Sequence, residues 1–252
     1  MIPLQRQETI IATLKVEPVL TIAALAQKLN VSEMTVRRDI QKLEEQGLVI
    51  QHGGGVKGTM RIFDEPSHEQ KAMMQSEEKL RIGQKASELV PPRSCIYLDA
   101  GTTTLALGKQ FVGRDDLTIV TNDLVVAQCL VTSSQNNVIM VGGQIRNSNL
   151  STVGHLAVYT LKALSIDLAF LSASSFDERG ITTPDPDKVV VKQEVARISA
   201  QRILVCDATK YGQVGTYIAV PMTEINTIIT DNRLTPSNQR QLIKTGVNLI
   251  MV

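Results

Sequence analysis

Tryptophan is absent from the 252-residue sequence, and cysteine is rare, with three residues in all. Cys95, Cys129 and Cys206 are far apart and form no Cys-x-x-Cys pair, and the first and last lie in apolar, strand-like runs. Cysteines in such positions behave as buried free thiols. The sequence therefore predicts neither a disulfide nor a metal site, and we expect no cofactor.

Long apolar runs are also missing. No stretch approaches the roughly 20 apolar residues that a membrane-spanning helix needs. The first residues, MIPLQRQETI, lack the charged-then-apolar pattern of a signal peptide. We therefore expect a cytoplasmic protein with no membrane partner.

The sequence also lacks a large excess of either positive or negative charge. The formal net charge is +1, with 43% hydrophobic and 20% charged residues, as in an ordinary soluble globular protein. The first 60 residues hold seven basic and six acidic side chains, so they form no broad basic surface. Any DNA binding must therefore come from locally placed cations, and from two copies acting together.

A helix-turn-helix pattern occupies residues 21–46. Thr21 is placed to cap a first helix, Asn30 suits the tight turn, and Ser32 is placed to cap a second helix. The apolar spacing of both helices predicts one buried face, formed by Ile22, Leu25, Ala26, Leu29, Val36, Ile40 and Leu43. This spacing is typical of a module whose second helix enters the DNA major groove.

The outer face of the second helix begins with small polar and guanidinium groups, which suit base edges and phosphates. A small helical hairpin with a solvated basic face is the alternative. Gly47 is placed to end this helix, and two short strands around the glycines that follow His52 predict a wing. His52 either contacts the phosphate backbone or is a solvated turn residue. The predicted DNA-binding residues are Thr21, Ser32, Met34, Thr35, Arg37, Arg38, Lys42 and His52.

Beyond residue 75 the sequence alternates between short apolar strands and helices. This alternation predicts an α/β fold with a mainly parallel sheet covered by helices on both faces. We expect a winged helix-turn-helix domain at 1–57, a linker at 58–75 and a larger domain at 76–252, with a helical stretch over 68–90. The predicted strands are 95–98, 117–120, 138–141, 166–171, 203–206, 225–229 and 247–252.

Small and hydroxyl residues follow these strands, where the ligands of such sheets bind. The segment DAGTTT at 99–104 offers backbone N–H groups and hydroxyls to an anion, although Thr102 as a simple helix cap is an alternative. Lys192, Lys210 and Arg146 can pair with a phosphate or can be solvated. The predicted effector-binding residues are Asp99, Gly101, Thr102, Thr103, Thr104, Asn122, Gly143, Arg146, Lys192, Asp207 and Lys210.

The sequence resembles the DeoR family of bacterial transcriptional repressors. The N-terminal match is LAQKLNVSEMTVRRDIQKLEEQGLVIQHGGGV, and later matches are DAGTTT, VTND, GGQIR, GITT, VKQ and CDATKYG. The resemblance implies a sensor domain that is similar in fold to ribose-5-phosphate isomerase and binds a phosphorylated sugar or a related metabolite. One departure is LSASSFDERG, where the family commonly has a Gly-x-Asp-Gly type segment, so the identity of the ligand does not transfer.

We therefore expect a sequence-specific DNA-binding repressor of a sugar or sugar-acid catabolic operon, controlled by a phosphorylated sugar or sugar-acid effector. Its expected partners are double-stranded operator DNA and a second copy of the chain, as a homodimer or homotetramer. The alternatives are a sugar-phosphate isomerase-like enzyme and an architectural DNA binder without a ligand. The DNA-binding module argues against the enzyme, and the polar strand ends argue against the architectural protein.

Overall fold

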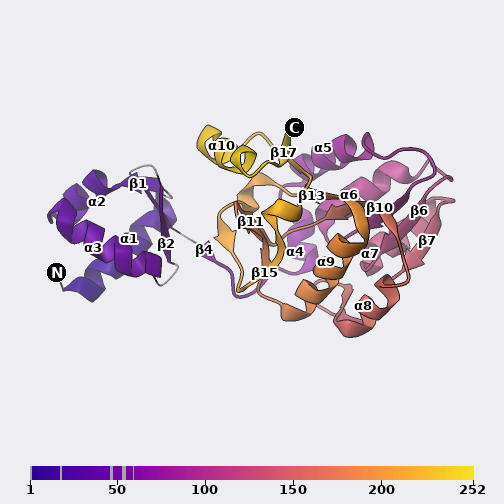
Figure 1. Ribbon diagram of the computed structural model, residues 1–252, viewed down its shortest axis with the longest axis horizontal. Coiled ribbons are helices and arrows are strands. Elements are labelled where there is room, and N and C mark those ends of the chain that lie inside the picture. Colours follow the sequence, from indigo (N-terminus) through magenta and orange to yellow (C-terminus); the bar gives the residue numbers. More distant parts are fainter. Residues whose placement is uncertain (1, 18, 46–47, 53–54, 59) are drawn as a thin grey trace. The chain divides into compact units, whose positions relative to one another are not determined.

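The computed structural model describes residues 2–17, 19–45, 48–52, 55–58 and 60–252. The chain forms two compact units (Figure 1). The smaller unit comprises Met1–Arg61 with Gly212–Val214, and the larger comprises Ile62–Tyr211 with Gly215–Val252. Each unit has its own apolar core.

The smaller unit packs three helices against a three-stranded antiparallel sheet in the order β1-β3-β2. The helices are α1 (Pro3–Val16), α2 (Ile22–Leu29) and α3 (Glu33–Glu45), and the strands are β1 (Val19–Thr21), β2 (Val49–His52) and β3 (Gly55–Gly58). Its core holds the predicted apolar face of α2 and α3 together with Ile10, Leu14, Val49 and Val56. The winged helix-turn-helix fold is therefore confirmed.

The turn of this module has the predicted local chemistry. Thr21 Oγ1 accepts a hydrogen bond from the Ala24 amide at 3.1 Å and caps α2. Asn30 ends α2 in the left-handed conformation at φ 51°, which asparagine tolerates better than most residues. Ser32 Oγ accepts from the Thr35 amide at 3.2 Å. Gly47, predicted as the cap of α3, and two glycines of the wing lie outside the described residues.

The larger unit is built on a seven-stranded sheet in the order β17-β16-β13-β10-β5-β6-β7, with every pair parallel. The strands are β5 (Cys95–Leu98), β6 (Thr118–Thr121), β7 (Asn137–Met140), β10 (Ile166–Leu171), β13 (Ser199–Val205), β16 (Thr227–Thr230) and β17 (Asn248–Met251). The central strands are almost fully buried, as expected for a sheet that is covered on both faces.

Two apolar clusters lie on opposite faces of this sheet, and each is closed by its own helices. One face carries α5 (Ser76–Ser87), α6 (Thr102–Gly108) and α7 (Leu124–Ser133), and the other carries α8 (His155–Leu161), α9 (Pro186–Ile198) and α10 (Pro236–Lys244). Figure 1 shows these helices around the sheet. The predicted fold class is confirmed. No helix among the described residues is long and apolar enough to span a membrane.

Short elements outside the main sheet escaped the sequence analysis. A second, antiparallel sheet joins β11 (Ser175–Asp177), β12 (Gly180–Thr183) and β15 (Tyr217–Pro221). A hairpin joins β8 (Gln144–Arg146) to β9 (Ser151–Val153), and β4 (Met60–Arg61) pairs with β14 (Gln213–Val214). Single 3-10 turns are η1 (Lys109–Phe111), η2 (Ala208–Lys210) and η3 (Met222–Glu224). These strands have two to five residues, which is too short for a periodic signal.

Residues 62–75, expected as part of a linker, belong to the larger unit. They carry α4 (His68–Met73), which starts at a reciprocal capping box between Ser67 and Gln70. The helix expected over residues 68–90 is also broken, because Gln75 has a left-handed φ of 53° between α4 and α5. After this break Lys79 of α5 lies against the Lys71 carbonyl of α4, at the carboxyl ends of the main strands.

Candidate DNA-binding and effector sites

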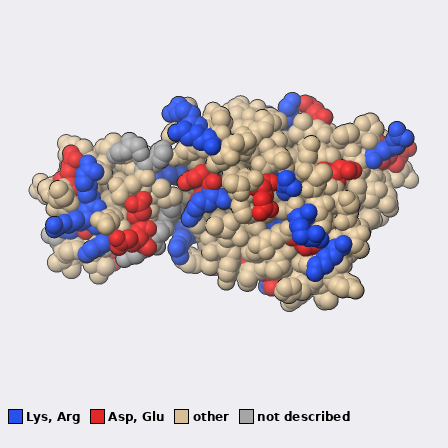
Figure 2. All heavy atoms as spheres, in the orientation of Figure 1, with Lys and Arg blue, Asp and Glu red and all other residues tan. Residues whose placement is uncertain are grey.

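Helix α3 carries five of the eight residues that the sequence assigned to DNA, namely Met34, Thr35, Arg37, Arg38 and Lys42. The Met34 side chain is 65% exposed, and Arg38 and Lys42 are also exposed. Arg37 lies 3.7 Å from Glu33, and both side chains are more than half exposed, so this ion pair is weak and can give way to a phosphate. Basic and acidic side chains are interspersed on the visible face of this unit (Figure 2), in agreement with its small net charge.

Thr21, Ser32 and Thr35 have a structural role in this unit. Thr21 caps α2, and the Ser32 and Thr35 hydroxyls lie 2.9 Å apart at the start of α3. His52 ends β2, and its side chain lies outside the described atoms. Contact of these four residues with DNA remains a prediction.

A buried ion pair fixes α1 against α3, and the sequence analysis did not predict it. Asp39 belongs to the TVRRD segment but points into the unit, where it pairs with Arg6 of α1. Gln7 Nε2 donates to Asp39 Oδ1 at 3.1 Å. The position of Asp39 on the buried side of α3, beside Val36 and Ile40, is the signal that would have identified it. The pair sets the rotation of α3 and therefore which side chains face outward.

A cavity of about 80 Å³ lies at the carboxyl ends of the main strands in the larger unit. It has room for on the order of five to eight water-sized groups, which suits a small metabolite. Strands β5, β6, β10 and β13 lead into it. It is lined by Glu65, Lys71, Met74, Gln75, Lys79, Asp99–Thr103, Asn122, Asn149, Ser151, Ser172–Ser174, Lys188, Val191, Lys192, Val205–Asp207, Thr209 and Lys210.

The charges around this cavity favour an anion. Five lysines line it, against the three carboxylates of Glu65, Asp99 and Asp207. Burial lowers the pKa of both Lys71 and Lys79, although Glu65 and Asp207 respectively oppose the shift. A negative group from a ligand would offset that cost of burial. The predicted residues Lys192 and Lys210 are two of these five lysines.

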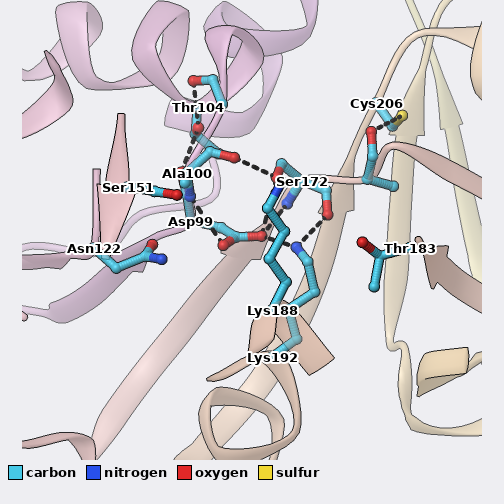
Figure 3. A network of polar contacts seen from close by, with 12 residues as sticks. Asp99, Ala100, Thr104, Asn122, Ser151, Ser172, Thr183, Lys188, Lys192 and Cys206 are labelled. Atoms are coloured by element: carbon cyan, nitrogen blue, oxygen red, sulfur yellow. Dashed lines mark hydrogen bonds and ion pairs between the residues drawn. The ribbon is translucent and has the colours of Figure 1, made fainter. Parts of the chain in front are cut away.

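Asp99 and Lys192 form the centre of a polar network (Figure 3). The Asp99 Oδ2 atom accepts from Lys192 Nζ, from the Ser172 amide at 2.9 Å and from Ser172 Oγ at 3.0 Å. Lys192 Nζ also donates to the Ser172 carbonyl at 2.7 Å, and Asp99 Oδ1 accepts from the Ala100 amide at 2.9 Å. Asp99 therefore ties the end of β5 to the end of β10, and much of its bonding capacity is already used.

The DAGTTT turn is only partly available to a ligand. The Gly101 amide donates to Asp123 Oδ2 at 3.0 Å, and a Cβ at Gly101 would come within 3.1 Å of Ser172 Cβ. Thr104 is fully buried and donates to the Asp99 carbonyl at 2.6 Å and the Gly101 carbonyl at 2.8 Å, so it does not line the cavity. Thr102 and Thr103 do line it. Gly101, and not Thr102, is the residue that precedes α6.

Asn122 and Asp207 line the cavity and have protein partners. Asn122 Oδ1 accepts from the Tyr97 hydroxyl at 2.7 Å, and Nδ2 donates to the Thr152 carbonyl at 2.9 Å. Asp207 caps η2 and accepts from the Thr209 amide at 3.2 Å. Both side chains are held in fixed orientations at the edge of the sheet.

Two further predicted residues do not reach the cavity. Gly143 has a φ of 152° and packs beneath the Val153 carbonyl, where an added Cβ would come within 3.1 Å. Arg146 pairs with Asp185 at 2.9 Å and with Asp187 at 2.8 Å. Gly143, Arg146 and Thr104 therefore do not line the cavity.

The sequence analysis did not assign residues 65–79 to the site, because this segment follows no strand of the main sheet. Glu65, Lys71, Met74, Gln75 and Lys79 of this segment nevertheless line the cavity. Lys79 of α5 donates to the Lys71 carbonyl and, at 2.5 Å, to the Met74 carbonyl, so it holds the end of α4 in place. Lys71 of α4 donates to Asn149 Oδ1 at 3.0 Å. The Ser67-x-x-Gln70 capping pattern was the one sequence signal of a structured element here.

Comparison with known proteins identifies both units. The profile of the DeoR C-terminal sensor domain matches residues 74–232, and that of the DeoR-like helix-turn-helix domain matches residues 6–60. The chain is 47% identical over 251 residues to the uncharacterized HTH-type transcriptional regulator YgbI of Escherichia coli (strain K12), covering 100% of this chain and 98% of that protein.

Two more distant relatives are named as repressors. The lactose phosphotransferase system repressor of Lactococcus lactis subsp. lactis is 30% identical over 237 residues, with 93% of each chain covered. The glycerol-3-phosphate regulon repressor of Escherichia coli (strain K12) is 30% identical over 228 residues, with 90% of each covered. Ribose 5-phosphate isomerase A of Methanocaldococcus jannaschii is 13% identical, with 54% of each chain covered and a TM-score of 0.41.

The first of these relatives is named as a transcriptional regulator and the next two as repressors, and this chain itself matches the helix-turn-helix domain, so the comparisons support the regulator and not the isomerase-like enzyme. Helix α3 lies within the helix-turn-helix match, and most residues that line the cavity lie within the sensor-domain match. The chain belongs to the DeoR family of DNA-binding transcriptional regulators.

Proposed function

We propose that this chain represses genes for the catabolism of a sugar or sugar acid, and that a phosphorylated sugar or sugar acid is its effector. The main support for this proposal is the cavity at the strand ends. Five lysines and three carboxylates line it, and Thr102, Thr103 and Ser172 add hydroxyl groups. Lysines and hydroxyls are the groups that hold phosphates and polyols. Relatives named as repressors of a lactose phosphotransferase system and a glycerol-3-phosphate regulon support the same class of genes.

The effector phosphate is proposed to lie between Thr102, Thr103 and Lys210. Lys210 follows β13 and the threonines follow β5, and these two strands flank β10, so all three residues line the cavity at the carboxyl ends of the strands. Asn122 and Ser172 would accept or donate hydrogen bonds to ligand hydroxyls. Asp99 and Lys192 form the floor of this site through the bonds they make to each other and to Ser172.

Operator DNA is proposed to contact α3 through Met34, Thr35, Arg37, Arg38 and Lys42, with Thr21, Ser32 and His52 nearby on the backbone side. The near-neutral small unit makes one copy a weak binder, because few phosphates are neutralised per copy. A homodimer or homotetramer in the cytoplasm, reading paired half-sites, would double those contacts. Effector binding would change operator affinity by favouring one arrangement of the assembly.

Operator binding of arginine variants tests the DNA assignment. Arg38→Ala and Arg37→Ala are each expected to weaken binding to DNA from the regulated promoter by about 5- to 150-fold, since a base or phosphate contact is worth about 1–3 kcal/mol. Arg240→Ala, an exposed arginine on α10, is the matched control and should bind as the wild type does. Full affinity of both α3 variants would contradict the assignment.

A further inference from the structure

Glu65 places a carboxylate in the cavity although it follows no strand of the main sheet. Its Oε2 atom accepts from Lys71 Nζ at 2.7 Å and from Lys188 Nζ at 2.9 Å, and its Oε1 atom accepts from Thr183 Oγ1 at 3.3 Å. The Glu65 side chain is 9% exposed. Two cations and a hydroxyl from α4, α9 and β12 thus surround one anionic group, which is how proteins bind a carboxylate.

The two lysines need an anion between them. Their side chains are 14% and 12% exposed. Burial lowers the pKa of Lys71, Glu65 opposes that shift and Lys188 adds to it. Burial raises the pKa of Glu65, but Lys188 and Lys71 outweigh burial and hold it well below its usual value. Two charged lysines at this place require an anion, and a ligand can supply it as well as Glu65 can.

The charge balance separates two classes of ligand. With Glu65 in place, five lysines against three carboxylates leave an excess of two positive charges, which matches a phosphate monoester of about −1.5 to −2. When Glu65 leaves, the excess rises to three. A ligand that carries a carboxylate in addition to its phosphate then balances the cavity.

We propose that Lys71 and Lys188 form a second anion subsite, which Glu65 occupies in this structure. The carboxylate of a phosphorylated sugar acid displaces Glu65 from it. This inference rests on the proposed function, because it assumes that the cavity binds a phosphorylated effector. Glu65 lies four residues after Arg61, where the chain leaves the DNA-binding unit. Its release therefore loosens the segment that leads into that unit, which gives the effector a route to the DNA-binding domain.

Calorimetric titration of the full chain with matched probes tests the subsite. The pairs are 3-phosphoglycerate with glycerol 3-phosphate, and 6-phosphogluconate with glucitol 6-phosphate, which differ by a carboxylate in place of a hydroxymethyl group. At least one acid should bind about tenfold or more tightly than its alcohol partner, as expected for a charge-assisted pair.

Two variants test whether the tighter binding of the acid depends on Glu65 and Lys188. Glu65→Gln should increase it by removing the internal competitor, and Lys188→Met should abolish it. Glu69→Gln, which removes an exposed carboxylate from α4, four residues after Glu65, is the matched control and should keep the wild-type ratio.

The outcomes separate the subsite from the proposed function. Equal affinities within both pairs, or a preference that Glu65→Gln does not raise, would overturn the subsite and leave phosphorylated-effector sensing intact. Failure of all four probes to bind would contradict the proposed function and the subsite with it. Hydrogen exchange of residues 62–67 in the wild-type chain needs no variant. Exchange should become faster with the bound acid than with its alcohol, and equal exchange would overturn the displacement of Glu65.

Discussion

Replacing Lys192 with methionine should destabilise the larger unit strongly, because it leaves Asp99 buried without its cation. Both side chains are less than a tenth exposed. Removing one partner of a buried ion pair costs about 3–5 kcal/mol. Asp99 would keep its bonds from the Ser172 amide, Ser172 Oγ and the Ala100 amide, so we expect a loss near 3 kcal/mol, at the lower end of that range.

Scanning calorimetry of the full chain measures this loss as a shift in the transition of the larger unit. A unit of this size shifts by about 2–4 °C per kcal/mol, so the midpoint should fall by about 6–12 °C. Lys162→Met, which removes an exposed lysine after α8, is the matched control and should shift it by no more than about 2 °C.

A second substitution separates lost charge balance from lost packing. In the double variant Asp99→Asn with Lys192→Met, no buried charge is left unpaired, and most of the stability should return. A single variant that unfolds within about 1 °C of the wild type would refute the reasoning, as would a double variant no more stable than the single one.

Three further predictions concern Gly180, Asp39 and Glu65. Gly180→Ala should cost at least about 3 kcal/mol, because φ is 137° and the new Cβ would lie 2.2 Å from the Val220 carbonyl oxygen. Gly246→Ala, with φ 88° and open space, should cost only about 1–2 kcal/mol, and equal losses in thermal unfolding would disprove the clash. Asp39→Ala should cost about 3–5 kcal/mol in the smaller unit, because it removes the carboxylate that pairs with the buried Arg6 guanidinium. Operator binding should fall in gel-shift assays while effector binding persists, and unchanged unfolding of that unit would contradict this. Glu65 has a pKa below its usual value, so its stabilisation is present above the unfolded pKa of about 4.3 and is lost as the pH falls towards the folded pKa. The difference in thermal midpoint between wild type and Glu65→Gln should therefore shrink below about pH 4, and a constant difference from about pH 6 to 3 would argue against the pairing.

Periodicity predicted the elements that bury a continuous apolar face. Strand β10 at Ile166–Leu171 has the predicted bounds. It combines a short apolar run with small polar residues directly after it, so local sequence alone determines it. Thr21 and Asn30 were predictable for the same reason, because a cap depends on residues within one turn.

The parts that sequence could not predict depend on contacts between distant residues. The three threonines of the DAGTTT pattern look alike in the sequence, yet Thr102 and Thr103 line the cavity while Thr104 is fully buried and donates to the Gly101 carbonyl. Glu65 reaches Lys188 across 123 positions of the chain. No local pattern records such a pairing, since it depends on how α4 and α9 pack against the sheet.

Operator affinity measured with and without effector shows whether the cavity and the DNA-binding face are coupled. Fluorescence anisotropy of labelled promoter DNA should give a dissociation constant that changes at least about fivefold when a bound probe saturates the cavity. The probe's own affinity should change by the same factor when operator DNA is saturating, because coupling is reciprocal. Identical operator affinity at full occupancy of the cavity would contradict the account.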